Sequence, residues 1–497
     1  MFLGLAFLLR SSSFFQTAMG PDEGLYLLMA DRWLAGEGLY TTVWDNKPPG
    51  IYALFAASQL LFGHSVLAVR ISSLLAVASS CYLLYRLGSR LGGQRIVGAL
   101  AGLCYATFSV AYGALPANTE IFFTPFVVGA FSLLLSDEPT RRIWWSAPPL
   151  RLLGAGLLLG VAFEIKYVVV FDFVALLLIA ILAAWRRGAE ATLRRRRLGS
   201  LTTVLLLSVG FLLPFLLVTT SFWLGGRFPD YAYSNFTANL INSADTPFSP
   251  ALFLQVMRDQ VLRSLPLWVC LMLAPVYLLV FRDTSARDRR NILALLTWFG
   301  FAFVGVSFTK LFFRHYFLQV LPPLCLLTAL LVWFAVSDDR IAGRRRAFLI
   351  ALTVGVPLVL SSLVPLGWGS FYAYHRWIRG DRYWGDEAGE VSEYLKRQVD
   401  PGEAIFAGDF SPVLYYELGI RPPTRYAFPL MLTEPHFARV AGIDPDRELA
   451  DVMAKRPRFV VRQWEMDTPF YRKLADYLAR DYEHARSVNW IDLYRRR

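Results

Sequence analysis

A series of long apolar stretches constrains the fold of this chain more than any other feature of its sequence. Each approaches the ~20 residues that a helix needs to cross the hydrocarbon of a bilayer. The stretches lie near residues 2–18, 65–85, 96–112, 121–136, 152–165, 167–185, 201–222, 264–281, 291–308, 316–336 and 347–366. Because 55% of the 497 residues are hydrophobic, one water-soluble core could not bury them. We predict an α-helical polytopic membrane protein with about 11 transmembrane helices, the first of them retained and not a cleaved signal peptide.

The basic residues indicate how this bundle is oriented. Arginines cluster in alternate connections between the apolar stretches, and such connections face the cytoplasm. The clusters are Arg86, Arg90 and Arg95; Arg141 and Arg142; Arg186, Arg187 and Arg194 to Arg197; Arg282, Arg287, Arg289 and Arg290; and Arg340 and Arg344 to Arg346. The loops 19–64 and 223–263 and the C-terminal part are then expected on the non-cytoplasmic side. The net charge of +12 therefore indicates membrane topology, and no nucleic-acid partner is expected.

The composition changes near residue 367. We predict a transmembrane domain over 1–366 and a small extracytoplasmic α/β domain over 367–497. The hydrophobic pattern of the second part predicts helices at 390–398, 412–418 and 471–480 and strands at 404–407 and 459–461. In the first outer loop, apolar residues at helical spacing predict interfacial helices over 21–36 and 51–62. The sequence contains no GxGxxG, Walker A or nucleophile-elbow motif.

The first outer loop carries the charges that most suggest chemistry. Asp22 and Glu23 follow the first apolar stretch directly. A carboxylate there can take a proton from an acceptor hydroxyl or hold a divalent ion, although Pro21 before an acidic pair also suits a first helical turn. Lys47 is the one cation of the turn Trp44-Asp45-Asn46-Lys47-Pro48-Pro49-Gly50. It suits an anionic phosphate, and a snorkelling lysine is the alternative.

Other polar residues give weaker signals. Arg314 and His315, within Lys310–Tyr316, could bind a leaving phosphate or only anchor the chain at the interface. Glu120 could hydrogen-bond a substrate hydroxyl or start the next helix. Asp172 lies inside an apolar stretch, where a carboxylate has either a functional role or a bundle-facing hydrogen bond. The four cysteines lie in apolar stretches and the five histidines are scattered, so no metal site is predicted.

Several of these motifs together resemble a known family. They are Pro21-Asp22-Glu23-Gly24-Leu25-Tyr26, the turn Trp44–Gly50, Arg70, Asn118-Thr119-Glu120 and Arg314-His315-Tyr316 followed by Pro322-Pro323. The chain resembles the GT-C glycosyltransferases of the protein O-mannosyltransferase and lipid A aminoarabinose transferase type. The resemblance covers residues 1–366 and implies transfer of a sugar from a polyprenyl phosphate on the non-cytoplasmic side of a bacterial inner membrane, with inversion at the anomeric carbon.

The resemblance also implies roles for individual residues. Asp22 would be the general base and Glu23 its neighbour in the catalytic pair. Lys47 would contact the donor phosphate, as would Arg314 and His315, although a histidine here separates the arginine from Tyr316. Substrate contacts are implied for Tyr26, Asp45, Arg70, Glu120 and Tyr316.

The sequence leaves two alternative functions to be considered. A polyprenyl-linked glycan flippase or transporter would be expected to have two related halves, and no internal repeat is visible. An oligosaccharide ligase or polymerase would depend more on outer-loop arginines. The expected partners are a polyprenyl-phosphate sugar, a lipid, glycan or protein acceptor, and the bilayer. No cofactor is expected, and a divalent metal is left open.

Overall fold

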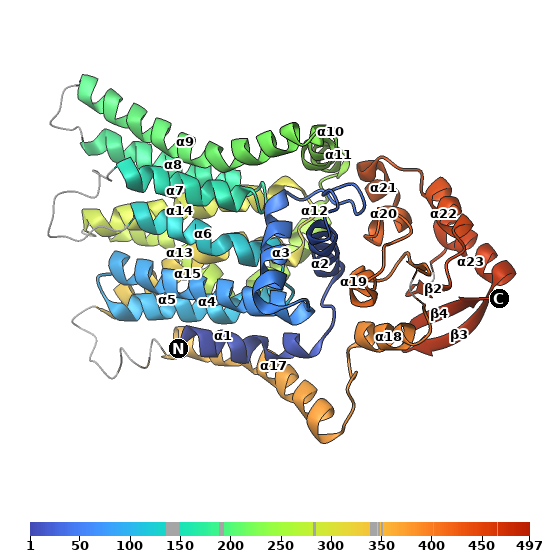
Figure 1. Ribbon diagram of the computed structural model, residues 1–497. Helices are drawn as coiled ribbons and strands as arrows, with labels where there is room; N and C mark the ends of the chain where they lie inside the picture. The colour runs from blue at the N-terminus through green and yellow to red at the C-terminus, as the bar shows by residue number, and fades with distance from the viewer. Residues whose placement is uncertain are drawn as a thin grey trace. The chain divides into compact units, whose positions relative to one another are not determined.

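The computed structural model describes residues 1–135, 149–187, 193–281, 285–337, 345, 348, 351–400, 402–464 and 466–497. The protein is mostly helical and forms two compact units (Figure 1). The first unit contains Met1–Ser11, Ser72–Thr219 and Phe248–Trp368, and the second contains Ser12–Ile71, Thr220–Pro247 and Gly369–Arg497. Each unit therefore combines segments that are far apart in the sequence. The boundary proposed at residue 366 stays a prediction.

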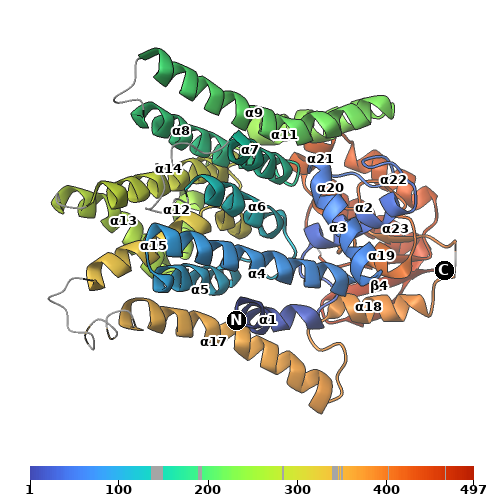
Figure 2. The same cartoon turned by 60° about the vertical axis from the view of Figure 1, so that its left-hand side comes forward.

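The first unit is a bundle of apolar helices. Its helices are α1 (Phe2–Arg10), α5 (Arg95–Ala111), α6 (Thr119–Leu134), α7 (Pro149–Phe163), α8 (Val169–Arg187), α12 (Pro250–Arg263), α13 (Leu265–Val280), α14 (Ala286–Phe308), α15 (Leu321–Val336) and the short turns at Arg314–Gln319 and Ala351–Gly355. Three helices extend from this unit into segments of the other: α4 (Val66–Leu91), α9 (Leu193–Leu224) and α17 (Val356–Ala373). Figures 1 and 2 show α6 beside α7 and α5 beside α15.

Small residues let these helices approach closely. A Cβ added to Gly156 of α7 would lie 2.3 Å from the Leu207 carbonyl oxygen of α9, and one on Gly160 would lie 2.4 Å from the Phe211 oxygen. This spacing is the small-xxx-small pattern by which membrane helices bring their backbones together. Pro322 and Pro323 lie in the first turn of α15, where a missing amide donor costs no hydrogen bond within the helix.

Where the structure describes them, the predicted apolar stretches coincide with a helix or with a helix and an adjoining turn; residues 136, 347, 349 and 350 lie outside the described residues. Among the described residues, four helices are long and apolar enough to cross a membrane: α4, the part of α9 from Arg197 to Leu224, α14 and the segment 352–378. The pair α12 and α13 would add one more span, and these two helices are bent by 101°. The number of eleven spans stays a prediction. Six of the topology-setting arginines lie outside the described residues: Arg141, Arg142, Arg282, Arg340, Arg344 and Arg346.

The second unit joins both outer loops to the C-terminal part. Its helices are α2 (Pro21–Leu34), α3 (Pro49–Phe62), α10 (Phe228–Ala232), α11 (Ala238–Asp245), α18 (Glu387–Lys396), α19 (Val413–Leu418), α20 (Leu430–Thr433), α21 (Pro435–Ala441), α22 (Pro445–Ala454) and α23 (Pro469–Asp481), with a 3-10 turn at Ser11–Phe15 and π-helical turns at Tyr233–Thr237 and Tyr374–Ile378. Its sheet has the order β1 (Ile405–Ala407), β2 (Phe459–Arg462), β4 (Ile491–Arg496), β3 (Tyr482–Val488). β1 and β2 are parallel, with Phe406 opposite Val460, and the other pairs are antiparallel.

Helix α2 packs against α19, so the first loop and the C-terminal part share a core. A Cβ on Gly24 would lie 2.8 Å from the Val413 backbone nitrogen, and glycine is therefore required for this approach. The Trp44 N–H donates to the Arg425 carbonyl oxygen at 2.8 Å, which fixes the start of the Lys47 turn. The residues of the first loop are thus held in place by a segment almost 400 positions later in the chain.

The predicted elements of the outer loop and the C-terminal part are confirmed within a few residues. They match α2, α3, α18, β1, α19, β2 and α23. The hairpin of β3 and β4 and the helices α20 to α22 were not predicted. Strand β3 reads Tyr-Glu-His-Ala-Arg-Ser-Val, and its mostly polar composition hides the alternation by which a half-buried strand is recognised.

Candidate active site

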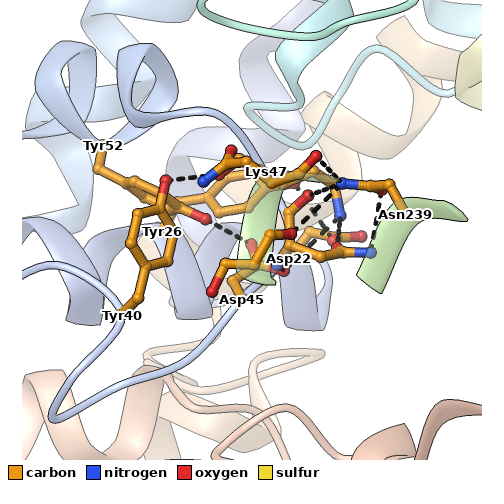
Figure 3. Close-up of polar contacts among 10 residues, drawn as sticks. Asp22, Tyr26, Tyr40, Asp45, Lys47, Tyr52 and Asn239 are labelled. Carbon is orange, nitrogen blue, oxygen red and sulfur yellow. Dashed lines mark hydrogen bonds and ion pairs between the residues drawn. The ribbon is translucent and has the colours of Figure 1, made fainter. Parts of the chain in front are cut away.

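Asp22 lies in the first turn of α2, and the local sequence explains why the helix begins here. Pro21 occupies the first helical position, where its fixed φ suits the helix and no amide donor is needed. The acidic side chains of Asp22 and Glu23 interact favourably with the positive end of the helix dipole. Asp22 is partly exposed, and its Oδ1 accepts a hydrogen bond from the Tyr26 hydroxyl at 3.3 Å (Figure 3). It therefore retains capacity to accept a proton from a ligand.

Asp45 and Lys47 lie beside Asp22 in the turn that leads to α3. The Lys47 ammonium is 3.7 Å from Asp45 Oδ1 and donates to Asn46 Oδ1 at 3.1 Å. Asp45 Oδ2 accepts from the Tyr52 hydroxyl at 2.8 Å. Asp45 is buried, whereas 22% of the Lys47 side chain is exposed. We call Asp22, Tyr26, Asp45, Lys47 and Tyr52 the first-loop cluster, which Figure 3 shows together.

Two further residues fix the backbone of this turn. The buried Tyr40 hydroxyl donates to the Lys47 carbonyl oxygen at 2.8 Å, and Tyr40 itself has a φ of 69°, which an L-residue adopts only under constraint. Asn239, on α11 in the second outer loop, donates to the Asn46 carbonyl oxygen at 2.9 Å. These contacts hold Lys47 from both sides (Figure 3). The sequence did not indicate a role for Tyr40 or Asn239, because neither residue lies in a motif.

Asp45 is the buried carboxylate of the first-loop cluster. Burial raises the pKa of this carboxyl above its ordinary value. The Lys47 ammonium opposes the shift, and the negative charge of Asp22 adds to it.

Glu23 has different surroundings from its neighbour Asp22. Its Oε1 lies 2.6 Å from Nη2 of Arg70, and both side chains are almost fully buried. Such a pair is costly to break, because either partner alone would leave an uncompensated buried charge. The contact joins the first turn of α2 to the first turns of α4. The ion pair therefore favours a structural role for Glu23, at the start of α2, over a catalytic one. Arg70 has the same structural role as its partner.

A second group of predicted residues lies in the other unit. Glu120 forms an ion pair with Lys166, and the Lys166 ammonium lies 3.8 Å from the centre of the Tyr316 ring, at cation–π distance. His315 acts electrostatically on Glu120. We call Glu120, Lys166, His315 and Tyr316 the Lys166 cluster. Lys166 lies in the turn between α7 and α8, so the ion pair joins this turn to the start of α6.

Arg314 precedes the Lys166 cluster in a conformationally unusual segment. It is exposed, and Lys310 and Phe312 before it have φ values of 59° and 49°. Left-handed backbone at two non-glycine residues is costly and is often found at binding sites. The structure thus brings His315, Tyr316 and Glu120 together in the first unit, while Asp22, Tyr26, Asp45, Lys47, Glu23 and Arg70 gather in the second.

Comparison with known proteins identifies relatives of this chain. A sequence model of the dolichyl-phosphate-mannose-protein mannosyltransferase family matches residues 46–220. The chain is 26% identical over 362 residues to undecaprenyl phosphate-alpha-4-amino-4-deoxy-L-arabinose arabinosyl transferase 2 of Proteus mirabilis, a match of 69% of this chain and 61% of that protein. It is 30% identical over 182 residues to the corresponding transferase 1 of Pseudomonas fluorescens, which is 34% of this chain and 30% of that protein.

Solved structures share the fold. ArnT from Cupriavidus metallidurans bound to undecaprenyl phosphate aligns with a TM-score of 0.64 over 99% of this chain and 97% of that chain, at 14% identity. The archaeal oligosaccharyltransferase AglB from Archaeoglobus fulgidus, in complex with an inhibitory peptide and a dolichol-phosphate, aligns with a TM-score of 0.55 over 96% of this chain and 70% of that chain, at 13% identity. The chain is thus similar in sequence to this mannosyltransferase family and to the aminoarabinose transferases, and it shares the fold of the solved ArnT structure.

Proposed function

We propose that this protein transfers a sugar from a polyprenyl-phosphate carrier to a hydroxyl group of a cell-envelope lipid, glycan or protein. The observation that carries the proposal is the first-loop cluster. The partly exposed carboxylate of Asp22 lies at the start of α2, and the partly exposed ammonium of Lys47 lies beside it in the turn that leads to α3. The relatives' names support the donor class, since they are undecaprenyl-phosphate sugar transferases.

The chemistry follows from the residues of this cluster. The acceptor oxygen attacks the anomeric carbon and forms the new glycosidic bond, while the bond from that carbon to the phosphate oxygen breaks. The attacking hydroxyl gives its proton to Asp22, and polyprenyl phosphate departs with the bonding electron pair. Lys47 stabilises the phosphate as a charge-assisted donor. Attack on the face opposite the leaving group inverts the anomeric configuration.

The other predicted residues have supporting roles in this proposal. Asp45 positions Lys47, and the Tyr52 hydroxyl orients Asp45. Tyr26 orients Asp22 through its hydroxyl. The Glu23–Arg70 pair fixes the first turn of α2. Arg314 and His315 remain phosphate contacts predicted by resemblance alone. No step in this scheme requires a metal ion.

Sugar transfer and lipid flipping differ in what happens to the donor. The full chain in lipid nanodiscs is mixed with undecaprenyl phosphate that carries a radiolabelled sugar and with a cell-envelope lipid extract as acceptor. Transfer predicts that label moves to the acceptor and that undecaprenyl phosphate is released in equal amount. A donor that stays intact in nanodiscs but crosses the bilayer of proteoliposomes would contradict transfer and support a flippase.

We also propose that the second unit faces the non-cytoplasmic side of the bacterial inner membrane. The segments 12–71 and 220–247 of this unit contain only Arg32, Arg70 and Arg227, which supports this orientation, and the number of predicted spans places 369–497 on the same side. In a variant without the native cysteines, single cysteines at the exposed positions Ala35 and Asp400 are expected to react with an impermeant thiol reagent in spheroplasts. A cysteine at Arg197 is the control and should react only after the membrane is opened. Protection of Asp400→Cys in intact spheroplasts would show that the number of spans is wrong.

A further inference from the structure

A pocket of about 260 Å³ lies next to the first-loop turn, within the second unit. Its wall is formed by Trp44, Asp230, Tyr233, Ser234, Arg425, Ala441 and Gly442. Ser234 and Tyr233 belong to the π-helical turn Tyr233–Thr237, a form of helix that is rare and frequent at functional sites. We call this feature the Ser234 pocket. None of its residues has a role in the transfer step described above.

The Ser234 pocket is connected to the first-loop cluster through the chain and through hydrogen bonds. Trp44 directly precedes Asp45 in the sequence. The Asn239 side chain donates both to the Asn46 carbonyl oxygen at 2.9 Å and to the Ser234 carbonyl oxygen at 3.4 Å. The Asn239 side-chain amide therefore links the turn that carries Lys47 to the wall of the Ser234 pocket. A molecule in the pocket lies beside the residues proposed to do the chemistry.

Ser234 contains a polar group that the protein leaves unused. Ser234 is 1% exposed, and its Oγ has no hydrogen-bond partner among the described residues. A buried hydroxyl without a partner is unfavourable and is uncommon in native proteins. A ligand that hydrogen-bonds to Oγ in the pocket removes this cost. The free hydroxyl is thus an observation that points to a ligand independently of the shape of the pocket.

The remaining wall defines what kind of ligand fits. Tyr233 is partly exposed and gives the pocket an aromatic surface, and the buried Trp44 ring lies 6.4 Å from the Tyr233 ring. Gly442 has a φ of 69°, and a Cβ there would lie 2.4 Å from the Tyr233 hydroxyl, so that only glycine leaves room for this ring. Asp230 supplies a carboxylate acceptor and Arg425 a guanidinium donor. Donors, acceptors and an apolar face are thus offered within one small volume.

These features select one class of ligand. A lipid chain would offer no polar partner to Asp230 or Arg425, and a phosphate would meet the negative charge of Asp230 as well as the positive charge of Arg425. A sugar ring matches the wall, because its hydroxyl groups both donate and accept while its C–H face packs on aromatic rings. The volume is below the roughly 300–1,000 Å³ of drug-sized sites, which suits a single ring.

We propose that the Ser234 pocket binds a sugar ring of the acceptor. This inference rests on the proposed function and makes it more specific, because the acceptor is then a glycan or glycolipid and not a bare lipid or a peptide. Ser234 hydrogen-bonds to a ring hydroxyl, and Tyr233 packs against the ring while the buried Trp44 supports Tyr233 from behind. These residues position the acceptor, whereas Asp22 takes its proton.

The first test measures binding without any chemistry. Saturation-transfer NMR is recorded on the full chain in nanodiscs with methyl α-D-glucopyranoside and with glucosamine as probes. Nanodiscs are necessary because common detergents carry sugar head groups. The wild-type protein should bind at least one probe, and Ser234→Ala should bind it roughly three- to tenfold more weakly, the loss expected for one hydrogen bond.

Ser392→Ala is a matched control. Ser392 is also buried in the second unit with an Oγ that has no hydrogen-bond partner among the described residues, but it lies on α18, outside the pocket. Both alanine variants should unfold at the wild-type temperature or slightly above it, and only Ser234→Ala should bind more weakly. Arg425→Gln, at an exposed position, gives a second variant in case Ser234→Ala does not fold. Failure of both probes to bind, or equal binding by Ser234→Ala and the wild type, overturns the inference.

The transfer assay separates this inference from the proposed function. Ser234→Ala should raise the KM for the acceptor roughly three- to tenfold and leave the KM for the donor unchanged. Sugar binding without any transfer would contradict the proposed function and leave the pocket intact. Transfer with an unchanged acceptor KM in Ser234→Ala would contradict the pocket alone, as would a peptide that serves as a better acceptor than any glycan.

Discussion

Asp22 and Asp172 are both carboxylates on helices of a very apolar protein, and their surroundings differ sharply. Asp172 on α8 is fully buried, and its two oxygens accept short hydrogen bonds from Trp298 Nε1 at 2.8 Å and Gln319 Nε2 at 2.6 Å. Asp22 is partly exposed and accepts one long hydrogen bond from Tyr26. A carboxylate whose oxygens are both occupied stabilises the bundle. One with an oxygen to spare can serve a ligand, and this distinction separates structural from functional charges in the molecule.

The largest loss of stability is expected when the buried Glu23–Arg70 ion pair is broken. Glu23→Gln leaves the Arg70 guanidinium without its partner, so the variant should lose about 3–5 kcal/mol of stability. Unfolding in denaturant, followed by circular dichroism, measures this loss.

A double variant tests whether Glu23 also takes part in catalysis. Glu23→Gln combined with Arg70→Met removes both charges and should recover most of the stability. If the pair is structural, transfer activity returns with the fold. A stable double variant that stays inactive would place Glu23 or Arg70 in the chemistry.

The next effect concerns the donor. Lys47→Ala removes a charge-assisted contact worth about 1.5–3 kcal/mol, so donor use should fall about ten- to a hundredfold. Lys473→Ala on α23, where the lysine pairs with Asp446 at the surface, is the control and should be near neutral. Steady-state kinetics with varied donor provide the measurement. Unchanged donor kinetics in Lys47→Ala would leave only a snorkelling lysine at this position.

A smaller effect is expected from Asp172→Asn, which should lower the stability of the protein and leave its activity unchanged. Asp172→Asn presents an amide N–H₂ to one of two donors and should cost about 1–3 kcal/mol. The folded protein should transfer sugar at the wild-type rate, which single-turnover kinetics at low temperature can measure. A folded Asp172→Asn variant with lost turnover would show that a fully hydrogen-bonded carboxylate also acts in catalysis, and the distinction from Asp22 would fail.

The sequence predicts local features of this fold well because their causes are local. Pro21 and the acidic pair predict the start of α2, and Pro48 and Pro49 predict the turn into α3, as the structure confirms. The contacts that complete the candidate site join distant segments. Glu23 and Arg70 are 47 positions apart, and Asn239 lies 193 positions from Asn46. No spacing rule relates such residues, and only the packed chain brings them together.

The central claim is that Asp22 takes the proton of the acceptor hydroxyl. Asp22→Asn keeps the size of the side chain and the acceptor oxygen for Tyr26 but cannot take a proton. Single-turnover transfer and donor affinity are measured separately on the purified variant in nanodiscs, with Asp31→Asn on the same helix as the control. We expect unchanged donor affinity and a transfer rate lowered by about 10²–10⁴, the usual contribution of a positioned general base. A wild-type transfer rate in folded Asp22→Asn would contradict the account.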